Sequence, residues 1–207
     1  MKLKGTLVFI ALVLLVAVAG VMARRVERRS GYEGSGYTLR SQIYHHGRPT
    51  GECIVYMFSN GDYRERKHDG DHIYGSMRVK GMGFFIIDES GQWIRKDDRV
   101  RSDLSVTVPT LKELRSRPDY VKDDTLLGAT AVMSRDVNPG SGKPIIELWR
   151  APDTIGFWTL KMISYDENTG EEDLRIEPIS IDFAEPDRAL LTLPNYRVGK
   201  PIEKPSQ

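Results

Sequence analysis

The sequence predicts a mainly β protein, an antiparallel meander curled into a half-barrel or incomplete β-barrel with at least one covering α-helix. Three observations predict it. About nine to eleven short segments show strand patterns, turn signals separate nearly all of them, and only one segment carries a clear helix signature. Many short, evenly spaced strands with little helix are typical of antiparallel barrels and sandwiches. An N-terminal hydrophobic helix is expected in addition.

The N-terminal segment predicts export or membrane attachment. Lys2 and Lys4 precede an uncharged run over residues 5–23, and four arginines follow it. A basic head before an apolar stretch is the mark of a signal peptide or an anchor. At ~1.5 Å per residue the run would reach ~28 Å, close to the ~30 Å of a bilayer core. We therefore expect an extracytoplasmic (periplasmic) domain that is attached to the membrane or released from it.

Two fates of residues 1–23 stay open. Val21 and Ala23 are small enough for the −3 and −1 positions of a signal peptidase site, which favours cleavage after Ala23. The length of the run favours a retained transmembrane anchor in the inner membrane. The arginines after the run disfavour their own translocation and, taken alone, would keep the domain on the cytoplasmic side. No cysteine stands directly after the run to carry a lipid.

The charge balance argues against nucleic-acid binding, and the cysteine content excludes an intramolecular disulfide. Without the two N-terminal lysines the chain has 28 basic and 29 acidic residues, so it lacks the basic surplus of a nucleic-acid-binding protein. Cys53 is the only cysteine, which excludes an intramolecular disulfide, and it is expected to be a buried apolar residue. The expected organisation is a signal peptide or anchor at 1–23, a flexible linker at 24–36, one β-rich domain at 37–196 and a polar tail at 197–207.

The first half of the domain predicts hairpins. Strands are expected at 37–46, 53–58, 63–68, 72–79, 84–88 and 92–96, with turns at 47–51, 60–62, 69–71 and 89–91. Residues 53–58 are apolar on both faces, as in a central strand. Residues 63–68, YRERKH, are polar on both faces, which predicts an edge or solvated strand.

A single helix follows. Thr110 and Glu113 have the spacing of a capping box, Leu111 and Leu114 share a face, and Pro118 closes the segment. The helix can have only two to three turns. Because so short a helix is marginal in water, it must dock on the sheet.

The second half returns to strands at 125–134, 145–151, 157–165 and 174–183. In the last of these the apolar phase begins with Leu174 and Ile176 and then shifts to Ile179 and Ile181. Since a strand pattern changes face only through an extra residue, a bulge is expected at Pro178. Residues 194–207 are expected to form a polar, proline-rich tail.

Two motifs resemble active sites. The loop 138–143 resembles a phosphate loop, but Val137 and Pro144 stand where that motif needs glycine and Ser or Thr. The segment 68–72 brings two histidines and two aspartates together, which a divalent metal could use and which a tight turn also explains. No catalytic residue, metal ligand or cofactor is predicted, and carboxylate pairs such as Asp97-Asp98 are expected to be solvated in turns.

Large apolar side chains are the remaining candidates for a site. A half-barrel has a concave face, and methionine and aromatic residues make such a face adaptable to acyl chains. The candidate ligand-binding residues are Met57, Phe58, Trp149, Trp158, Leu160 and Met162.

The C-terminal third resembles the LolA/LolB/RseB-like half-barrels, the bacterial lipoprotein-carrier family. The resemblance lies in IELWRAPDTIGFWTLKMISYD and in IEPISIDFAEPDRALLTLPNY, whose phrase PDRALLTLP matches a closing motif of that family. It extends loosely over residues 37–196. The resemblance implies a curved antiparallel sheet with helical cover, a hydrophobic cavity, and binding rather than catalysis.

The function expected from these observations is that of a non-enzymatic envelope protein similar to outer-membrane lipoprotein-sorting proteins. Its concave apolar face would bind a lipid, an acylated protein or another amphiphile. One alternative is a membrane-anchored protein-interaction or assembly module without a ligand cavity. The other is a metal-dependent hydrolase that uses His68, Asp69, Asp71 and His72.

Overall fold

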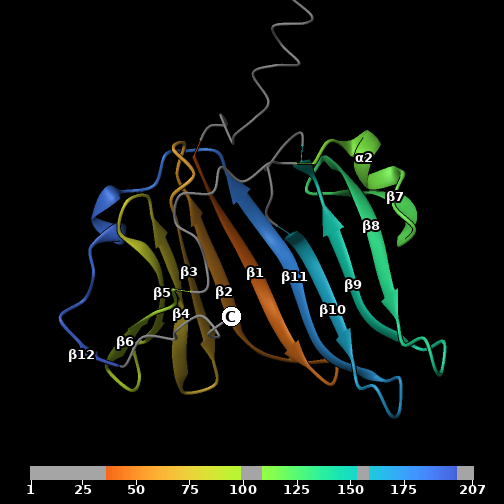
Figure 1. The fold of residues 1–207 in the computed structure, drawn as a ribbon, viewed down its shortest axis with the longest axis horizontal. Helices are drawn as coiled ribbons and strands as arrows, with labels where there is room; N and C mark the ends of the chain where they lie inside the picture. The colour runs from red at the N-terminus through yellow and green to blue at the C-terminus, as the bar shows by residue number, and fades with distance from the viewer. Residues whose placement is uncertain (1–35, 99–108, 153–158, 200–207) are drawn as a thin grey trace, which may run out of the picture.

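The computed structural model describes residues 36–98, 109–152 and 159–199. One curved sheet of twelve strands makes up most of these residues, and Figure 1 shows it as an open half-barrel. The half-barrel predicted from the sequence is therefore confirmed. The expected N-terminal helix and Trp158 lie outside the described residues. Within the described residues no helix is long and apolar enough to cross a membrane.

The first meander consists of six strands joined by short turns. They are β1 (Tyr37–His45), β2 (Arg48–Met57), β3 (Tyr63–Asp69), β4 (His72–Val79), β5 (Gly83–Asp88) and β6 (Trp93–Lys96). The second meander follows the helix α2 (Leu111–Arg115). It contains β7 (Tyr120–Leu126), β8 (Ala129–Val137), β9 (Pro144–Arg150), β10 (Thr159–Tyr165) and β11 (Glu172–Asp182). The chain continues through the 3₁₀ helix η1 (Arg188–Leu191) to β12 (Arg197–Val198).

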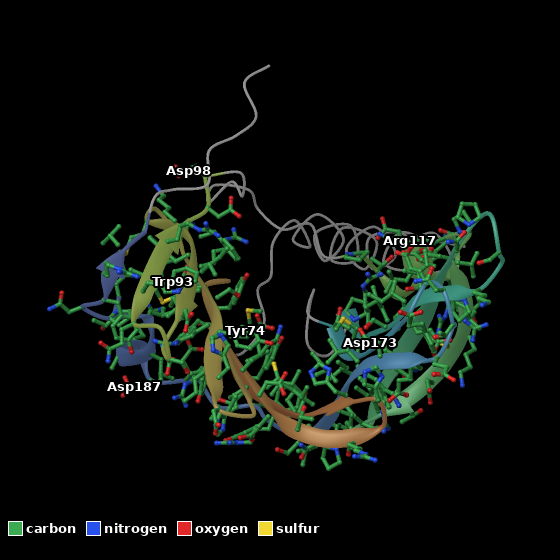
Figure 2. The ribbon with its side chains drawn as sticks, turned by 90° about the horizontal axis from the view of Figure 1, so that it is seen from below. Tyr74, Trp93, Asp98, Arg117, Asp173 and Asp187 are labelled. Atoms are coloured by element: carbon green, nitrogen blue, oxygen red, sulfur yellow. The ribbon has the colours of Figure 1, made fainter. Side chains whose placement is uncertain are left out.

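The two meanders are joined side by side through β1 and β11. The strand order is β12-β6-β5-β4-β3-β2-β1-β11-β10-β9-β8-β7, so the first and last long strands lie at the centre of the sheet. As a consequence β6 and β7, which are consecutive in the chain, lie at opposite arms of the half-barrel (Figure 1). Seen end-on, the sheet is a U (Figure 2).

The predicted bulge is present in β11. Arg40 pairs with Ser180 and Ser41 pairs with Pro178, which leaves Ile179 as the extra residue. Proline is tolerated at such a point because a bulge does not require its missing N–H. The capping box of α2 is also present, since Thr110 and Glu113 each accept from the other's backbone N–H. Leu114 is buried, but the helix has only five residues and is shorter than predicted.

Three local predictions were wrong. The β1–β2 turn contains only His46 and Gly47, both at positive φ, so residues 48–51 belong to β2. Segment 125–134 is interrupted by a turn at Leu127 and Gly128, again both at positive φ. The strand before this turn, β7, is too polar to have been predicted. Finally, β12 pairs with β6 inside the segment 194–207 expected to be a tail.

The strand β3 corrects a fourth prediction. It lies inside the sheet between β2 and β4, although its polar sequence predicted an edge or solvated strand. Its charged side chains have ion-pair partners on both faces. On one face Lys67 lies 3.1 Å from Glu65. On the other face Glu89, from the β5–β6 turn, binds Arg64 at 2.9 Å and Arg66 at 2.8 Å.

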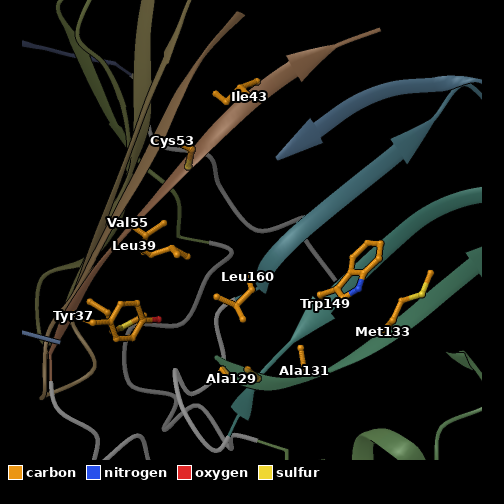
Figure 3. Packing of buried hydrophobic residues seen from close by; sticks show 12 residues of the cluster. Tyr37, Leu39, Ile43, Cys53, Val55, Ala129, Ala131, Met133, Trp149 and Leu160 are labelled. Atoms are coloured by element: carbon orange, nitrogen blue, oxygen red, sulfur yellow. The ribbon is translucent and has the colours of Figure 1, made fainter. Parts of the chain in front are cut away.

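Two apolar clusters hold the sheet. The larger joins the central strands to β8, β9 and β10, and its members include Tyr37, Leu39, Ile43, Val55, Trp149 and Leu160 (Figure 3). The smaller cluster lies on β4, β5 and β6, on the face of the sheet opposite to the side chain of Glu65. The C-terminal segment covers it. The cluster contains Met77, Phe85, Ile87 and Ile94, with Leu191, Leu193 and Tyr196 packed against them. Figure 2 shows this C-terminal segment, in blue, outside one arm of the U.

The Glu89 cluster fixes that covering segment and makes stability depend on pH. Arg64 also donates to the carbonyl of Leu190, which ties η1 to β3. Burial alone would raise the pKa of Glu89, but hydrogen bonds and charge from Arg66 and Arg64 outweigh burial and lower it. Because the folded-state pKa is lowered, the carboxylate stabilises the fold above its unfolded-state pKa. That stabilisation is lost as the pH falls through the lower folded-state value.

We expect Glu89→Gln to lower the free energy of unfolding at pH 7 by about 1.5–3 kcal/mol, the range for hydrogen bonds to charged groups. The difference between wild type and variant should shrink as the pH is lowered below about 4.5, the ordinary range of a glutamate. Urea unfolding at pH 7, 5, 4 and 3 measures it. A difference that stays constant over this series would show that the charge of Glu89 is not what stabilises the cluster.

Candidate functional site: a pocket on the concave face

A pocket of about 240 Å³ opens on the concave face of the sheet. It lies where β1, β2 and β3 face β10 and β11 across the curve. Its lining residues are Leu39, Ser41, Cys53, Val55, Glu65, Lys67, Thr159, Leu160, Met162 and Ile176. Curvature creates the pocket, because these strands are neighbours in one sheet and would share a flat surface otherwise.

Strand register explains which side chains meet in the pocket. Leu39, Val55 and Glu65 are cross-strand partners, so they form one row on one face of the sheet. Ser41, Cys53 and Lys67 form the next row. On the other side Met162 pairs with Ile176. The alternation of each strand therefore places one face of five strands around the pocket.

One wall of the pocket is apolar. Leu39 and Val55 are each 1 % exposed and belong to the core, as does Leu160. Met162 and Ile176 are half-buried and complete this wall. Figure 3 shows Leu160 lying between the side chains of β1 and β2 and those of β8 and β9. A ligand against this wall would bury apolar surface without losing a hydrogen bond.

The other wall contains a linked polar group centred on Glu65. Its carboxylate lies 3.1 Å from Lys67 Nζ and accepts from Ser76 Oγ at 3.2 Å. The Cys53 thiol lies 3.9 Å from the same carboxylate. Lys67 Nζ also lies 5.9 Å from the centre of the Tyr74 ring. This wall is polar but balanced, since the one carboxylate and the one ammonium are paired.

Burial changes how these groups titrate. It raises the pKa of Cys53 to about 12, and the negative charge of Glu65 adds to the effect. Burial by itself would lower the pKa of Lys67, but the charge and hydrogen bond of Glu65, together with Cys53 and Tyr74, outweigh burial and the pKa is raised. The lysine therefore keeps its charge, whereas the thiol stays protonated. Because a thiolate is the nucleophilic form of cysteine, Cys53 is not set up for covalent catalysis.

The six residues predicted as ligand contacts are distributed over different environments. Leu160 and Met162 line the pocket. Met57 belongs to the larger apolar cluster, and Phe58 is fully buried just after β2. Trp158 lies outside the described residues. The proposal that these side chains contact a ligand therefore applies to Leu160 and Met162.

Trp149 has a structural environment of its own. It pairs with Lys161, whereas Met162 pairs with Leu148, so Trp149 and Met162 project from opposite faces of the β9–β10 ladder. The ammonium of Lys161 lies 5.1 Å from the centre of the indole ring. The indole N–H donates to Asp124 at 3.0 Å. Trp149 is 5 % exposed, and both its ring face and its indole N–H are in contact with these neighbours.

Sequence reasoning missed the polar wall and much of the apolar one. Leu39, Val55 and Ile176 look like ordinary core residues in a strand pattern. Glu65 and Lys67 were overlooked because β3 was predicted to be exposed. Their spacing does hold a signal, since opposite charges two residues apart on a strand share one face and can neutralise each other.

The candidate metal segment folds as the β3–β4 turn. His45 Nε2 lies 2.8 Å from Asp69 Oδ2, while His72 lies 3.9 Å from Asp88 on β5. Asp69 therefore contacts a residue of β1, whereas His72 lies near a residue of β5. In the part of the chain that the structure describes, no three histidine, cysteine or carboxylate side chains are grouped so that they could hold a metal ion. The structure also corrects Asp97, which is 3 % exposed rather than solvated.

Comparison with known proteins gives matches of fold. No family model and no curated protein matches this chain. A crystal structure of MucB matches with 17 % identity and a TM-score of 0.43, over 87 % of this chain and 64 % of MucB. The Pseudomonas aeruginosa MucA/MucB complex matches with 18 % identity and a TM-score of 0.42, over 82 % of this chain and 59 % of that chain.

A LolA-superfamily protein from Nitrosomonas europaea also matches, with 8 % identity and a TM-score of 0.27, over 80 % of this chain and 93 % of that chain. The chain thus spans about 60 % of the length of the MucB chains. Solved structures that match this chain include those of MucB and of a LolA-superfamily protein.

Proposed function

We propose that this domain is a non-enzymatic binding protein of the cell envelope that takes the apolar part of a lipid, an acylated protein or another amphiphile into the concave pocket. The observation that carries the proposal is the pocket itself, with an apolar wall on β1, β2, β10 and β11 facing a balanced polar wall centred on β3. An amphiphile has the same division. Burial of its chain would supply ~0.8 kcal/mol per methylene.

The chemistry of the pocket favours binding over catalysis. Its one thiol is protonated, and its one carboxylate is neutralised by Lys67 and accepts a hydrogen bond from Ser76. A general acid and base would need two titratable groups whose surroundings separate their pKa values. The described residues around the pocket offer a single ion pair instead.

Two isoleucines on β11 provide a matched test. Ile176 lines the pocket, whereas Ile179 on the same strand is 55 % exposed and outside it. Ile176→Glu should weaken binding of a dansyl-labelled fatty acid to the full chain by roughly tenfold or more, or at least 1.4 kcal/mol, because it places a charge against the acyl chain. Ile179→Glu should bind like the wild type. Fluorescence titration measures both, and circular dichroism verifies that each variant is folded.

Three results would contradict the proposal. One is an affinity of folded Ile176→Glu equal to that of the wild type, which would place the ligand elsewhere. The second is equal loss in both variants. The third is an absence of fatty-acid binding by the wild-type protein, which would remove amphiphile binding as the function.

The size of the pocket favours a second candidate, a protein-interaction module. About 240 Å³ is below the ~300–1,000 Å³ of pockets that enclose drug-sized ligands. It would hold part of an acyl chain, or one or two apolar side chains of a protein partner. Native mass spectrometry of gently purified full-length protein separates the two. A lipid-sized additional mass supports the first candidate, and a stable polypeptide partner without lipid supports the second.

A further inference from the structure

Arg150, the last residue of β9, borders the concave pocket. It pairs with Thr159 of β10, and Thr159 lines the pocket. Cross-strand partners project from the same face, with their Cβ atoms about 4.5–5.5 Å apart. Leu148, two residues earlier on β9, pairs with Met162, which also lines the pocket. Arg150 therefore projects on the pocket's side of the sheet, one strand beyond the pocket wall.

The guanidinium of Arg150 is half-buried and has no carboxylate partner among the described residues. Neighbouring cations of the sheet differ in this respect. Arg135 lies 2.6 Å from Glu147, and Lys161 lies 2.9 Å from Glu177. A charge that is partly removed from water without a partner is costly to the fold. Arg150 is therefore suited to an anion that comes from outside the chain.

The segment after α2 brings a second positive charge to Arg150. Arg115 of α2 binds Asp123 at 2.6 Å. Asp123 pairs with Val132, and Val132 pairs with Arg150, so α2 lies on the face of the sheet from which Arg150 projects. Arg117 follows two residues after the end of the helix. Figure 2 labels Arg117 on the arm of the U that contains these strands.

The electrostatic environment of Arg150 is unfavourable for its own charge. Burial and the charge of Arg117 lower the pKa of the Arg150 guanidinium, and Asp119 and Asp136 offset this only in part. Because arginine stays protonated in proteins, the cation remains in place despite the lowered pKa. An anion bound beside it would relieve both the burial and the repulsion from Arg117.

The pocket itself supplies the apolar half of a binding site. Leu160 and Met162 offer apolar contact. Lys67 and Glu65 are paired at 3.1 Å, so the lining has no net charge of its own. An amphiphile whose chain lies against the apolar wall would thus find its counter-charge at Arg150, beyond the wall, rather than inside the pocket.

We propose that Arg150, supported by Arg117, anchors the headgroup of the ligand, and that the ligand is an amphiphile with an anionic headgroup, a carboxylate or a phosphate. The inference rests on the proposed function and names the ligand class of the same site. The planar guanidinium can donate a forked pair of hydrogen bonds to two oxygens of such a headgroup. Arg150 would distinguish a charged headgroup from a neutral one, which the apolar wall cannot do.

Two fluorescent probes that differ only in headgroup charge test this on the full chain, dansyl-labelled undecanoic acid and its methyl ester. Arg150→Met removes the charge and keeps a long side chain. It should weaken binding of the acid by roughly tenfold and leave the affinity for the ester unchanged. Arg95→Met is the matched control, because Arg95 is half-buried on β6, on the other arm, and does not line the pocket. This control should bind both probes like the wild type.

Urea unfolding separates a binding role of Arg150 from a structural one. Since its charge has no carboxylate partner in the described part of the chain, Arg150→Met should unfold at a midpoint no lower than that of the wild type. A lower midpoint with equal loss of acid and ester would assign Arg150 a structural role and overturn the proposal. So would an unchanged affinity of Arg150→Met for the acid, or an equal loss in Arg95→Met.

Competition distinguishes a bound headgroup from a free anion. Dodecyl phosphate should displace the acid probe from the wild type and should do so less effectively from Arg150→Met, whereas inorganic phosphate at the same concentration should not displace it. Displacement by inorganic phosphate alone would overturn the link between chain and charge. Wild-type binding of both probes with equal affinity would refute this inference only, and absence of binding of either probe would remove the proposed function together with it.

Discussion

Leu39→Ala is expected to lower the free energy of unfolding by about 2–5 kcal/mol, the range for leucine truncation in a packed core. Leu39 is 1 % exposed on β1, which pairs with β2 on one side and with β11 on the other. It therefore packs where the two meanders join. Because it also forms a wall of the pocket, the space left by the truncation is continuous with an existing cavity and cannot be filled by a small shift of neighbours.

The matched control is Leu127→Ala. Leu127 is 40 % exposed in the β7–β8 turn, and surface substitutions of this kind usually change stability by less than about 0.5 kcal/mol. Urea denaturation of both variants, followed by tryptophan fluorescence, gives the two free energies. A loss of less than about 1 kcal/mol in Leu39→Ala would mean that the β1–β11 junction is not close-packed as the structure has it.

Gly75→Ala is the second substitution with a large expected effect, a loss of about 1–3 kcal/mol from overpacking. Gly75 lies inside β4 and pairs with Arg66 on β3. An added Cβ would lie 2.0 Å from the backbone carbonyl oxygen of Glu65. Since the obstacle is backbone, relief requires β3 to move away from β4. That movement would displace Glu65 and with it the polar wall of the pocket.

Gly199→Ala is the control for Gly75→Ala. Gly199 directly follows β12 of the same sheet, and the nearest atoms to its added Cβ are 3.6 Å away, which is ordinary contact. Its stability should match that of the wild type within about 0.5 kcal/mol. Thermal unfolding followed by circular dichroism compares the three proteins. Equal stability of Gly75→Ala and Gly199→Ala would show that β3 and β4 are further apart than the structure indicates.

Local features of the fold were predictable because they depend on neighbouring residues. The bulge in β11 follows from the change of apolar phase at Pro178, and the capping box of α2 follows from Thr110 and Glu113. Most hairpins follow from glycine at positive φ, as at Gly61 and Gly70. Predictions failed where the turn was shorter or more apolar than usual, as at Leu127.

The position of β3 could not be predicted for a different reason. Arg64 and Arg66 share the carboxylate of Glu89, which is more than twenty residues away in the chain, and Glu65 and Lys67 neutralise each other. A charged strand can lie inside a sheet only when such partners are in place. The sequence shows the charges of the strand but not the distant turn that neutralises half of them.

The pocket was only partly predictable, because it too depends on residues that are distant in the chain. Leu160 and Met162 were identified from the strand pattern of 157–165, and both line the pocket. Cys53 and Lys67 reach it because β2 and β3, which lie three and four strands away from β10, share the same concave face. That distance is bridged by curvature, which depends on the twist of the whole sheet and has no local sequence mark.

By itself the sequence determined the mainly β class, the alternation of short strands and turns, the single capped helix and the bulge at Pro178. Each depends on interactions between residues close in the chain. Only the tertiary structure decided that β1 pairs with β11, which separates β6 from β7 and folds two meanders into one half-barrel. It also decided where the pocket opens. The physical reason is that strand pairing between distant segments is selected by the packing of the whole sheet, and many pairings satisfy the same local pattern.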